Sequence, residues 1–307
     1  MSNYRKDLPI VLLSGGVGGA RMARGLDAVC DELTVVVNVG DDETFYGLAV
    51  SPDLDTVMYT LAGTEGPAGW GVAGDTFDAM DRLGALGLDN RFRIGDRDLA
   101  TNLFRTARLQ QGAPLSQVTA ELTAGYGIAT RLLPATDQLV PTRVRSGESW
   151  MAFQEYFVLR GARDEVHELS YHGADEAAAA PGVVKAIEQA ACVVIAPSNP
   201  PLSIWPILAV PAIRSALAAA GRVVAVSPLF GGKALKGPAA RVMADLGLAG
   251  GNQGVADAYR DLLTHLVVDI SDADESLDTD AAVHALDTRI ADPAAAAEFA
   301  RALLELS

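Results

Sequence analysis

The sequence predicts an α/β fold in which helices cover both faces of a mainly parallel sheet. Three observations support this prediction. The segment 8–13 is apolar throughout and leads into a Gly-rich turn at 14–19, and a helical stretch over 20–29 precedes a second apolar run at 33–37. Neither run alternates apolar with polar residues, as expected of strands covered on both faces. Apolar runs and helical stretches alternate again over 177–227. This order is typical of a Rossmann-like, doubly wound sheet.

The middle of the chain is less regular and predicts a smaller subdomain inserted into that sheet, at approximately residues 75–175. Helical patterns come first, and partial alternation around a Gly-containing turn then indicates an antiparallel pair of strands. The expected elements are helices over 76–86, 96–110 and 115–125, strands over 139–145 and 151–160, and a continuation over 166–171.

The last part of the chain returns to regular α/β alternation. No long linker and no internal repeat interrupts it. Residues 1–307 are therefore predicted to form a single domain around one doubly wound core. The expected elements are helices over 177–190, 207–220, 255–264 and 293–306 and strands over 192–196, 223–227 and 266–270.

Composition excludes several classes of protein. Half of the 307 residues are hydrophobic and 21% are charged, as in an ordinary globular protein with a sizeable core. The formal net charge of −15 argues against a nucleic-acid binder, which needs a basic surface. No window approaches the roughly 18 apolar residues of a membrane span, and the polar start is unlike a signal peptide, so a cytoplasmic location without membrane contact is expected.

The residues that most often bind metals or form disulfides are few. Cys30 and Cys192 stand among apolar neighbours and are predicted to be small core residues. The four histidines show no metal-binding spacing, so surface or strand positions are expected for each. A site built on these residue types is not predicted.

The Gly-rich turn is the first candidate site. Gly15, Gly16, Gly18 and Gly19 flank Val17 and allow the backbone to approach an anion closely. The helix that follows offers amide groups and the positive end of its dipole, which suit a phosphate or diphosphate. The turn matches neither the P-loop nor the standard dinucleotide motif. A tight turn without a ligand is the alternative.

An acidic cluster follows the second predicted strand. Asp41 and Asp42 are adjacent, and Asp53 and Asp55 come about ten residues later. Neighbouring carboxylates repel each other unless a cation is present or one is protonated. They could bind Mg²⁺ together with substrate phosphates, or one could act as a general base. The alternatives are helix capping for Asp53 and Asp55 and solvated turn positions for Asp41 and Asp42.

Three further segments carry groups suited to ligands. Trp70 stands between glycines and could stack on a planar ring, although a core position is as compatible with the sequence. Arg97 opens a predicted helix and could meet a phosphate, while its acidic neighbours are ordinary capping residues. Ser198 and Asn199, after a predicted strand, suit a base or a ribose.

A glycine-rich loop near residue 233 carries two of the four lysines of the chain. Lys233 and Lys236 lie within the sequence GGKALKG. In a chain so poor in lysine, two on one glycine-rich loop indicate anion binding. A solvated turn is the alternative.

Taken in order, these segments resemble one known family. The motifs SGGVGGAR, VNVGDDETFYGLAVSPDLDTVMYTLAG, GWG, GDRDLATNLFRT, APSNPPLSIWPILAVPAIR and SPLFGGKALKGPA are similar to those of the CofD family of 2-phospho-L-lactate transferases. The resemblance covers residues 10–306. It implies a Rossmann-like core, a homodimer and a Mg²⁺-dependent transfer in coenzyme F420 biosynthesis. The implied donor is lactyl-2-diphospho-guanosine or its enolpyruvyl counterpart, and the implied acceptor is the deazaflavin Fo, with GMP released.

The same resemblance implies roles for the candidate residues. The turn from Gly15 to Gly19, with Lys233 and Lys236, would hold the diphosphate. The acidic cluster would supply a base and metal ligands, with Asp53 and Asp55 toward Fo. Ser198 and Asn199 would contact the guanosine. The implied metal ligands are Asp41, Asp42 and Asp55, and which aspartate serves as the base is left open.

Val17 stands where archaeal members have threonine, which favours the bacterial branch and an enolpyruvyl donor. Two other functions remain as alternatives: an NAD(P)-dependent oxidoreductase and a non-catalytic guanine-nucleotide-binding relative. On the transferase hypothesis, Asp41→Asn or Asp55→Asn is expected to abolish transfer and to leave the fold intact.

Overall fold

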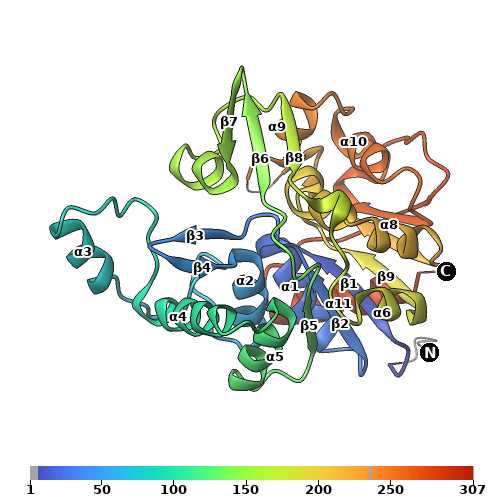
Figure 1. Cartoon of the computed structure of the whole chain (residues 1–307). Helices are drawn as coiled ribbons and strands as arrows, with labels where there is room; N and C mark the ends of the chain where they lie inside the picture. Colours follow the sequence, from blue (N-terminus) through green and yellow to red (C-terminus); the bar gives the residue numbers. More distant parts are fainter. Residues whose placement is uncertain (1–5, 235–236, 307) are drawn as a thin grey trace.

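Seven parallel strands form the central sheet of the computed structural model, which describes residues 6–234 and 237–306 (Figure 1). The order of the strands is β14-β13-β10-β9-β1-β2-β5. Every neighbouring pair is parallel, so the carboxyl ends of all seven strands share one edge. The strands are β1 (Ile10–Ser14), β2 (Leu33–Val37), β5 (Arg131–Pro134), β9 (Cys192–Ile195), β10 (Val223–Val226), β13 (His265–Asp269) and β14 (Ala282–Leu286).

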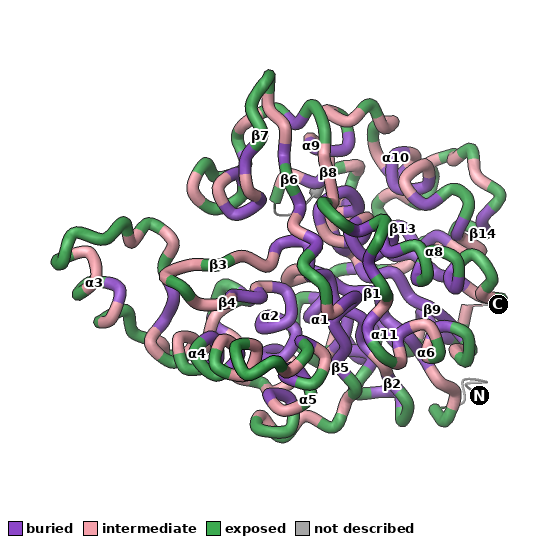
Figure 2. Tube along the Cα trace, viewed as in Figure 1, coloured by how far each residue is buried: buried purple, intermediate pink, exposed green. Residues whose placement is uncertain are grey.

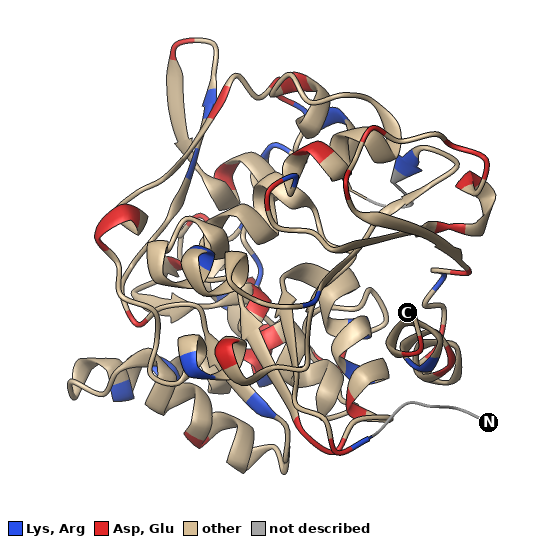
Figure 3. Cartoon of the chain, turned by 90° about the vertical axis from the view of Figure 1, so that its right-hand side faces the viewer, with Lys and Arg blue, Asp and Glu red and all other residues tan. Residues whose placement is uncertain are grey.

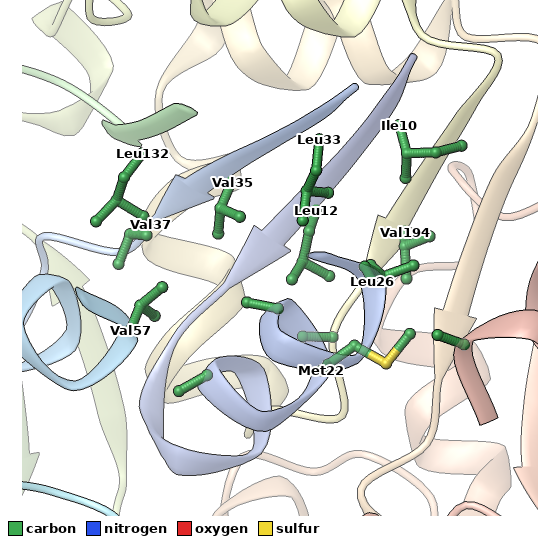
Figure 4. Close-up of a cluster of buried hydrophobic side chains, with 14 of the residues drawn as sticks. Ile10, Leu12, Met22, Leu26, Leu33, Val35, Val37, Val57, Leu132 and Val194 are labelled. Atoms are coloured by element: carbon green, nitrogen blue, oxygen red, sulfur yellow. The ribbon is translucent and has the colours of Figure 1, made fainter. Parts of the chain in front are cut away.

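Both faces of this sheet are covered by helices. In β1, Ile10 and Leu12 enter one hydrophobic core, whereas Val11 and Leu13 enter the other. Figure 4 shows the first core, where Met22 and Leu26 of α1 lie against Leu12. Each fully buried aliphatic side chain contributes about 1.5–3 kcal/mol. The first core is covered by α1 (Gly16–Asp27), α2 (Pro52–Leu61), α5 (Leu115–Gly125) and α11 (Pro293–Leu304), and the second by α6 (Val183–Gln189), α7 (Trp205–Leu208), α8 (Pro211–Ala218) and α10 (Gly251–Ala258).

The strand order places a topological switch point between β1 and β9. From β1 the chain proceeds outward through β2 to β5, and it then returns to the other side of β1 to form β9. The loops after β1 and β9 therefore diverge at the same edge, where ligands bind in sheets of this kind. The predicted doubly wound α/β fold is confirmed.

The segment expected as one insertion at 75–175 is divided by a strand of the central sheet. Strand β5 lies within it and pairs with β2. The strand was missed because it has four residues, begins with a charged residue and ends in Pro134. The elements between β2 and β5 include the hairpin β3 (Glu43–Phe45) and β4 (Leu48–Val50), and helices α3 (Asp78–Ala85) and α4 (Asp96–Gln110), which with α5 precede β5. Figure 1 shows α3 projecting farthest from the central sheet.

A second, antiparallel sheet follows β5 and accounts for the predicted antiparallel strands. Its order is β7-β6-β8, and it has a small core of its own that includes Val144 and Met151. The predicted strand over 151–160 is shorter in the structure, because a π-helix begins at Glu155. The strands are β6 (Thr142–Ser146), β7 (Ser149–Ala152) and β8 (Glu168–Tyr171), and the π-helix is η1 (Glu155–Leu159).

Buried residues are concentrated in the central strands and in the helices beside them (Figure 2). Cys30 and Cys192 are both buried, as predicted. His167 and His172 are exposed, and His265 and His284 lie on strands, also as predicted. The short elements are η2 (Ala174–Glu176), η3 (Pro200–Ile204), β11 (Leu229–Phe230), β12 (Lys233–Ala234), α9 (Ala239–Asp245) and η4 (Ile270–Asp272).

Among the described residues, no single helix is both long and apolar enough to cross a membrane. The helical segments Pro200–Leu208 and Pro211–Ala218 pass the test only as a pair, and they are bent by 92° relative to each other. Several of their apolar side chains belong to the second hydrophobic core.

Candidate active site

The Gly-rich turn lies at the switch point and packs tightly against two other loops. A Cβ on Gly15 would lie 2.7 Å from Asp53 Oδ2, and one on Gly18 would lie 2.5 Å from the carbonyl oxygen of Pro197. Gly16 has open space around it but a positive φ of 63°, which favours glycine. The close packing therefore explains why glycine occupies these positions: a larger residue would prevent the loops after β1 and β9 and the start of α2 from approaching each other.

Two hydrogen bonds fix this meeting of loops. The backbone N–H of Gly16, at the start of α1, donates to Asp53 Oδ1 at 2.7 Å. The Ser198 hydroxyl donates to the carbonyl oxygen of Gly15 at 2.6 Å. A carboxylate at a helix N-terminus is stabilised by the helix dipole, so an internal anion already occupies one of the α1 amides.

Asn38, at the end of β2, brings two of the predicted aspartates together. Its side-chain amide donates to Asp41 Oδ1 at 3.2 Å and to Asp53 Oδ2 at 3.0 Å. Its carbonyl oxygen accepts from the backbone N–H of Gly40 at 2.7 Å. Asp41 and Asp53 are only 7% and 6% exposed. Neither is the solvated turn residue or simple cap that the alternatives described, and Asn38 was not predicted as part of the site.

Burial makes both of these carboxyl groups hard to ionise. It raises the pKa of Asp41 well above the ordinary value, and the nearby charges of Asp53 and Asp42 raise it further. Burial also raises the pKa of Asp53, which hydrogen bonds from Asn38, Gly16 and Asp41 oppose. The arrangement favours a protonated Asp41 that donates to an ionised Asp53. Such a pair can accept or release a proton.

Asp42 has one satisfied and one unsatisfied carboxylate oxygen. Its Oδ2 accepts from the Ser51 hydroxyl at 2.7 Å. Its Oδ1 is buried and has no hydrogen-bond partner in the part of the chain that the structure describes. Burial raises the pKa of Asp42 well above the ordinary value. A buried carboxylate oxygen without a partner is uncommon and needs an explanation such as a bound ligand or ion.

Asp55 is not available in the same way, because a buried arginine neutralises it. Arg105 of α4 forms an ion pair with Asp55, and both side chains are almost fully buried. The guanidinium also donates to Asn102 Oδ1 at 2.9 Å and to the carbonyl oxygen of Ala49 at 3.3 Å. Sequence reasoning missed Arg105. Its signal is a polar stripe on α4, in which Asp98, Asn102 and Arg105 recur at helical spacing.

The predicted metal ligands are therefore not gathered as a set of three. Among the described residues, no three aspartate, glutamate, histidine or cysteine side chains could hold a metal ion together. Asp55 faces Arg105, whereas Asp41 and Asp42 are adjacent, buried and leave one oxygen without a partner. Mg²⁺ often uses only one or two carboxylates and otherwise binds waters and substrate phosphates. Asp42 fits that description, whereas Asp41 is engaged by Asn38 and Asp53 and Asp55 is engaged by Arg105.

The other predicted residues lie around this centre or away from it. Trp70 is 61% exposed, so the alternative of a core tryptophan is wrong. Arg97 is exposed and donates to the carbonyl oxygen of Ala73 at 2.7 Å. Lys233 is exposed on β12, and Lys236 lies outside the described residues. Charged residues occur in all parts of the fold (Figure 3).

Only one of the two polar atoms of the Asn199 side-chain amide has a hydrogen-bond partner among the described residues. Its carbonyl oxygen accepts from the backbone N–H of Leu202 at 3.3 Å and so caps η3. Its Nδ2 is buried and has no partner within the described ranges. Similar unsatisfied atoms end β1 and begin β6. After β1, β2 and β9 and at the start of β6, the buried atoms without a described partner include Ser14 Oγ, Asp42 Oδ1, Thr142 Oγ1 and Asn199 Nδ2.

Val17 faces a separate hollow on the outer side of α1. This hollow of about 300 Å³ is also lined by Arg21, Arg24, Glu65 and Asp292. Arg24 forms an ion pair with Glu65, and Asp292 caps α11 through the N–H of Ala295. The loop that carries Trp70 closes over Val17, because a Cβ on Gly69 would lie 2.6 Å from its side chain.

Comparison with known proteins gives a consistent result. The family model described as 2-phospho-L-lactate transferase CofD matches residues 10–301. A phosphoenolpyruvate transferase of Kitasatospora aureofaciens is 43% identical, and the alignment covers 97% of each chain. One of Mycolicibacterium smegmatis is 40% identical over 98% of this chain and 99% of the relative.

Solved structures resemble the fold at low sequence identity. A UPF0052-family protein from Bacillus halodurans has a TM-score of 0.64 at 15% identity, covering 98% of this chain and all of the other. Another crystal structure of the same Bacillus halodurans protein gives a TM-score of 0.61, also at 15% identity, and covers 92% of this chain and 93% of the other. At this identity the likeness concerns the arrangement of helices and strands alone.

Proposed function

This chain belongs to the CofD family of 2-phospho-L-lactate transferases, and we propose that it moves a phosphorylated three-carbon acid from a guanosine diphosphate ester to the deazaflavin Fo. The acceptor is the terminal hydroxyl of the ribityl chain of Fo, and the leaving group is GMP. The product is an F420-type phosphodiester. The donor is the enolpyruvyl ester, as the names of the bacterial relatives and Val17 both favour.

One observation carries this proposal. The Gly-rich turn, the Asp41–Asp53 pair and the loop of Ser198 and Asn199 meet at the switch point, and buried polar atoms there have no described partner. An anion-binding turn beside buried carboxylates suits phosphoryl transfer, which depends on positioning and charge neutralisation more than on covalent chemistry.

The residues of this chain would divide the work as follows. The amides at the start of α1 and the lysines of the loop at 233–236 hold the diphosphate of the donor. The hydroxyl oxygen of Fo forms a bond to phosphorus while the bond from phosphorus to the GMP oxygen breaks. The ionised member of the Asp41–Asp53 pair accepts the hydroxyl proton. Asp42, through its oxygen without a described partner, would hold Mg²⁺ together with the substrate phosphates, and the ion would supply neutralisation of the phosphate charge.

The outer residues contribute to substrate binding in this proposal. Asn199 Nδ2 donates to the guanosine, while Ser198 serves by fixing the Gly15 carbonyl. Trp70, which is exposed, stacks on the planar ring of Fo. Arg97 remains a candidate phosphate contact at the outer margin.

Mass spectrometry of the reaction products tests the proposal. The protein is mixed with Fo, Mg²⁺ and either the enolpyruvyl or the lactyl guanosine diphosphate. A phosphodiester of Fo together with GMP supports the transferase, and the faster donor identifies the acid. Binding of guanine nucleotide without GMP release would contradict the proposal and favour the non-catalytic relative. NADH binding without a requirement for Mg²⁺ would favour the oxidoreductase.

A further inference from the structure

Gln154 connects the second sheet to the acidic turn of the candidate site. It follows β7, immediately before η1, and is 3% exposed. Its side-chain amide donates to the backbone carbonyl of Asp41 at 2.9 Å, although the two residues are 113 positions apart in the sequence. A buried amide donor of this kind is costly to leave unpaired, so the bond constrains the conformation of the turn.

Asp42 directly follows the residue that Gln154 holds. Within the described ranges its side chain accepts one hydrogen bond, from the Ser51 hydroxyl to Oδ2 at 2.7 Å. Its other oxygen, Oδ1, is buried and has no described partner.

A second strand of the same sheet strengthens this connection. The backbone N–H of Thr142, at the start of β6, donates to the carbonyl oxygen of Gly40 at 2.6 Å. The contact is so close that a Cβ on Gly40 would lie 2.6 Å from Thr142 Oγ1. The turn that begins at Gly40 is therefore held at two points, the carbonyl oxygens of residues 40 and 41, by residues that follow β5 in the chain.

We propose that Gln154 is a positioning residue, which holds the backbone immediately before Asp42 and so fixes the direction of the unsatisfied Asp42 oxygen toward the substrate phosphates. Such a constraint is needed because the Asp42 oxygen has no described hydrogen bond of its own that would fix its direction. Small losses of positioning reduce phosphoryl transfer strongly. This inference rests on the proposed transferase function for its catalytic consequence, but the clamp itself, the hydrogen bond from Gln154 to the Asp41 carbonyl, does not depend on it.

Two variants of the full-length protein test the clamp. Gln154→Met keeps the length of the side chain and removes the donor, and Gln154→Glu keeps the shape and places an oxygen against the Asp41 carbonyl. The matched control is Asn90→Leu. This variant removes a hydrogen bond from a side-chain amide to the backbone carbonyl of Met80, and Asn90 lies after α3, in a different part of the fold from Gln154. Thermal unfolding measured for each variant establishes that it is folded.

Two readouts then separate positioning from plain stabilisation. We expect faster amide hydrogen exchange in peptides that cover residues 38–43, and a kcat about tenfold lower with the KM for Fo within about twofold. Asn90→Leu should change neither. If both Gln154 variants exchange and turn over like the wild type, the proposal is overturned. If the wild type itself shows no transfer, the proposed function fails, and the hydrogen-exchange comparison still decides whether the clamp exists.

Discussion

At the scale of single residues, the site is built from carboxyl groups that burial and proximity hold away from their ordinary ionisation. Asp41 and Asp53 share the amide of Asn38 and lie within hydrogen-bonding reach of each other. Isolated, either group would be costly to bury; together they hold one proton and one charge. This is a chemical state that a surface aspartate does not provide.

Asp41→Asn therefore separates catalysis from stability. We expect transfer to fall by at least about 100-fold, because the proton-accepting pair is lost. The melting temperature should stay about the same, since a neutral amide replaces a carboxyl group whose pKa burial raises well above its ordinary value. GMP release at saturating Mg²⁺ and differential scanning calorimetry measure the two effects. Turnover close to that of the wild type would contradict the role assigned to the pair.

Asp98 is not part of the proposed proton-transfer pair, but its ionisation should make the stability of the fold depend on pH. It accepts hydrogen bonds from Tyr59 at 2.7 Å and from Asn102, and burial, followed by the charge of Asp55, raises its pKa to about 6. The folded protein thus holds this proton more tightly than the unfolded chain, where the pKa is about 3.9. The resulting stabilisation is present below about pH 4 and is lost as the pH rises through about 6.

Asp98→Asn should flatten that part of the stability curve. We expect unfolding free energies, measured by urea titration at intervals from pH 4 to pH 7.5, to fall less steeply with pH than those of the wild type. Parallel curves for the two proteins would show that Asp98 ionises normally in the fold. The exposed Asp280 provides the control through Asp280→Asn.

At the scale of elements, α2 and α4 are joined by the buried pair of Asp55 and Arg105. Removing one partner leaves an uncompensated charge, so Arg105→Met should cost about 3–5 kcal/mol in the free energy of unfolding. Asp55→Asn should destabilise for the same reason, which revises the expectation that it leaves the fold intact. The double variant Asp55→Leu/Arg105→Met should recover most of the loss. Urea denaturation measures all of these effects, and additive losses in the double variant would contradict the pairing.

The junction between β2 and the second sheet makes a separate prediction at Gly40. A Cβ there would lie 2.6 Å from Thr142 Oγ1 and 2.8 Å from Pro206 Cβ. Gly40→Ala should therefore destabilise the protein by about 1–3 kcal/mol through overpacking. Gly221→Ala is the control, because Gly221 has neither a close neighbour nor a positive φ. Equal unfolding free energies for the two variants would contradict the tight junction.

At the scale of the whole molecule, exposed apolar side chains on the projecting segment predict self-association. Leu86 and Leu88 after α3 and Leu103 and Phe104 of α4 are each at least 41% exposed. A homodimer that covers such a surface should sediment with twice the chain mass of 32.0 kDa. Leu86→Glu/Leu88→Glu should shift the equilibrium toward the single chain. A wild-type protein that stays monomeric at micromolar concentration would contradict this assembly.

Five strands of the central sheet, β1, β2, β9, β10 and β13, could be predicted from sequence because they are largely buried and carry continuous apolar runs. The edge strand β14 was missed, because it is partly exposed and contains a histidine. Strand β5 and the hairpin of β3 and β4 could not be predicted either, since each has only three or four residues and mixes polar with apolar side chains. Local sequence does not carry enough signal for such strands, which pairing in the folded sheet stabilises instead.

The loops that form the site could be predicted from the sequence, but the hydrogen bonds and ion pairs between its side chains could not. Glycines and aspartates after strands indicate a ligand edge, and the structure brings the Gly-rich turn, Asp41 and Asp53 together there. Sequence reasoning missed Arg105, Asn38 and Gln154. Their hydrogen bonds and ion pairs join residues that are distant in the chain, and nothing in the neighbouring sequence indicates these contacts. Burial of polar residues is a property of the fold and not of the local pattern.

Strand β1 illustrates how folding and chemistry depend on the same atoms. Because both of its faces are apolar, a shift by one residue would exchange Leu12 with Leu13 at little hydrophobic cost, so burial alone does not specify its alignment. The polar contacts just beyond the strand, from Gly16 to Asp53 and from Ser198 to Gly15, do specify it. The polar contacts of the candidate site therefore fix the register of β1: a chain that slips by one position loses these contacts before it loses its hydrophobic core.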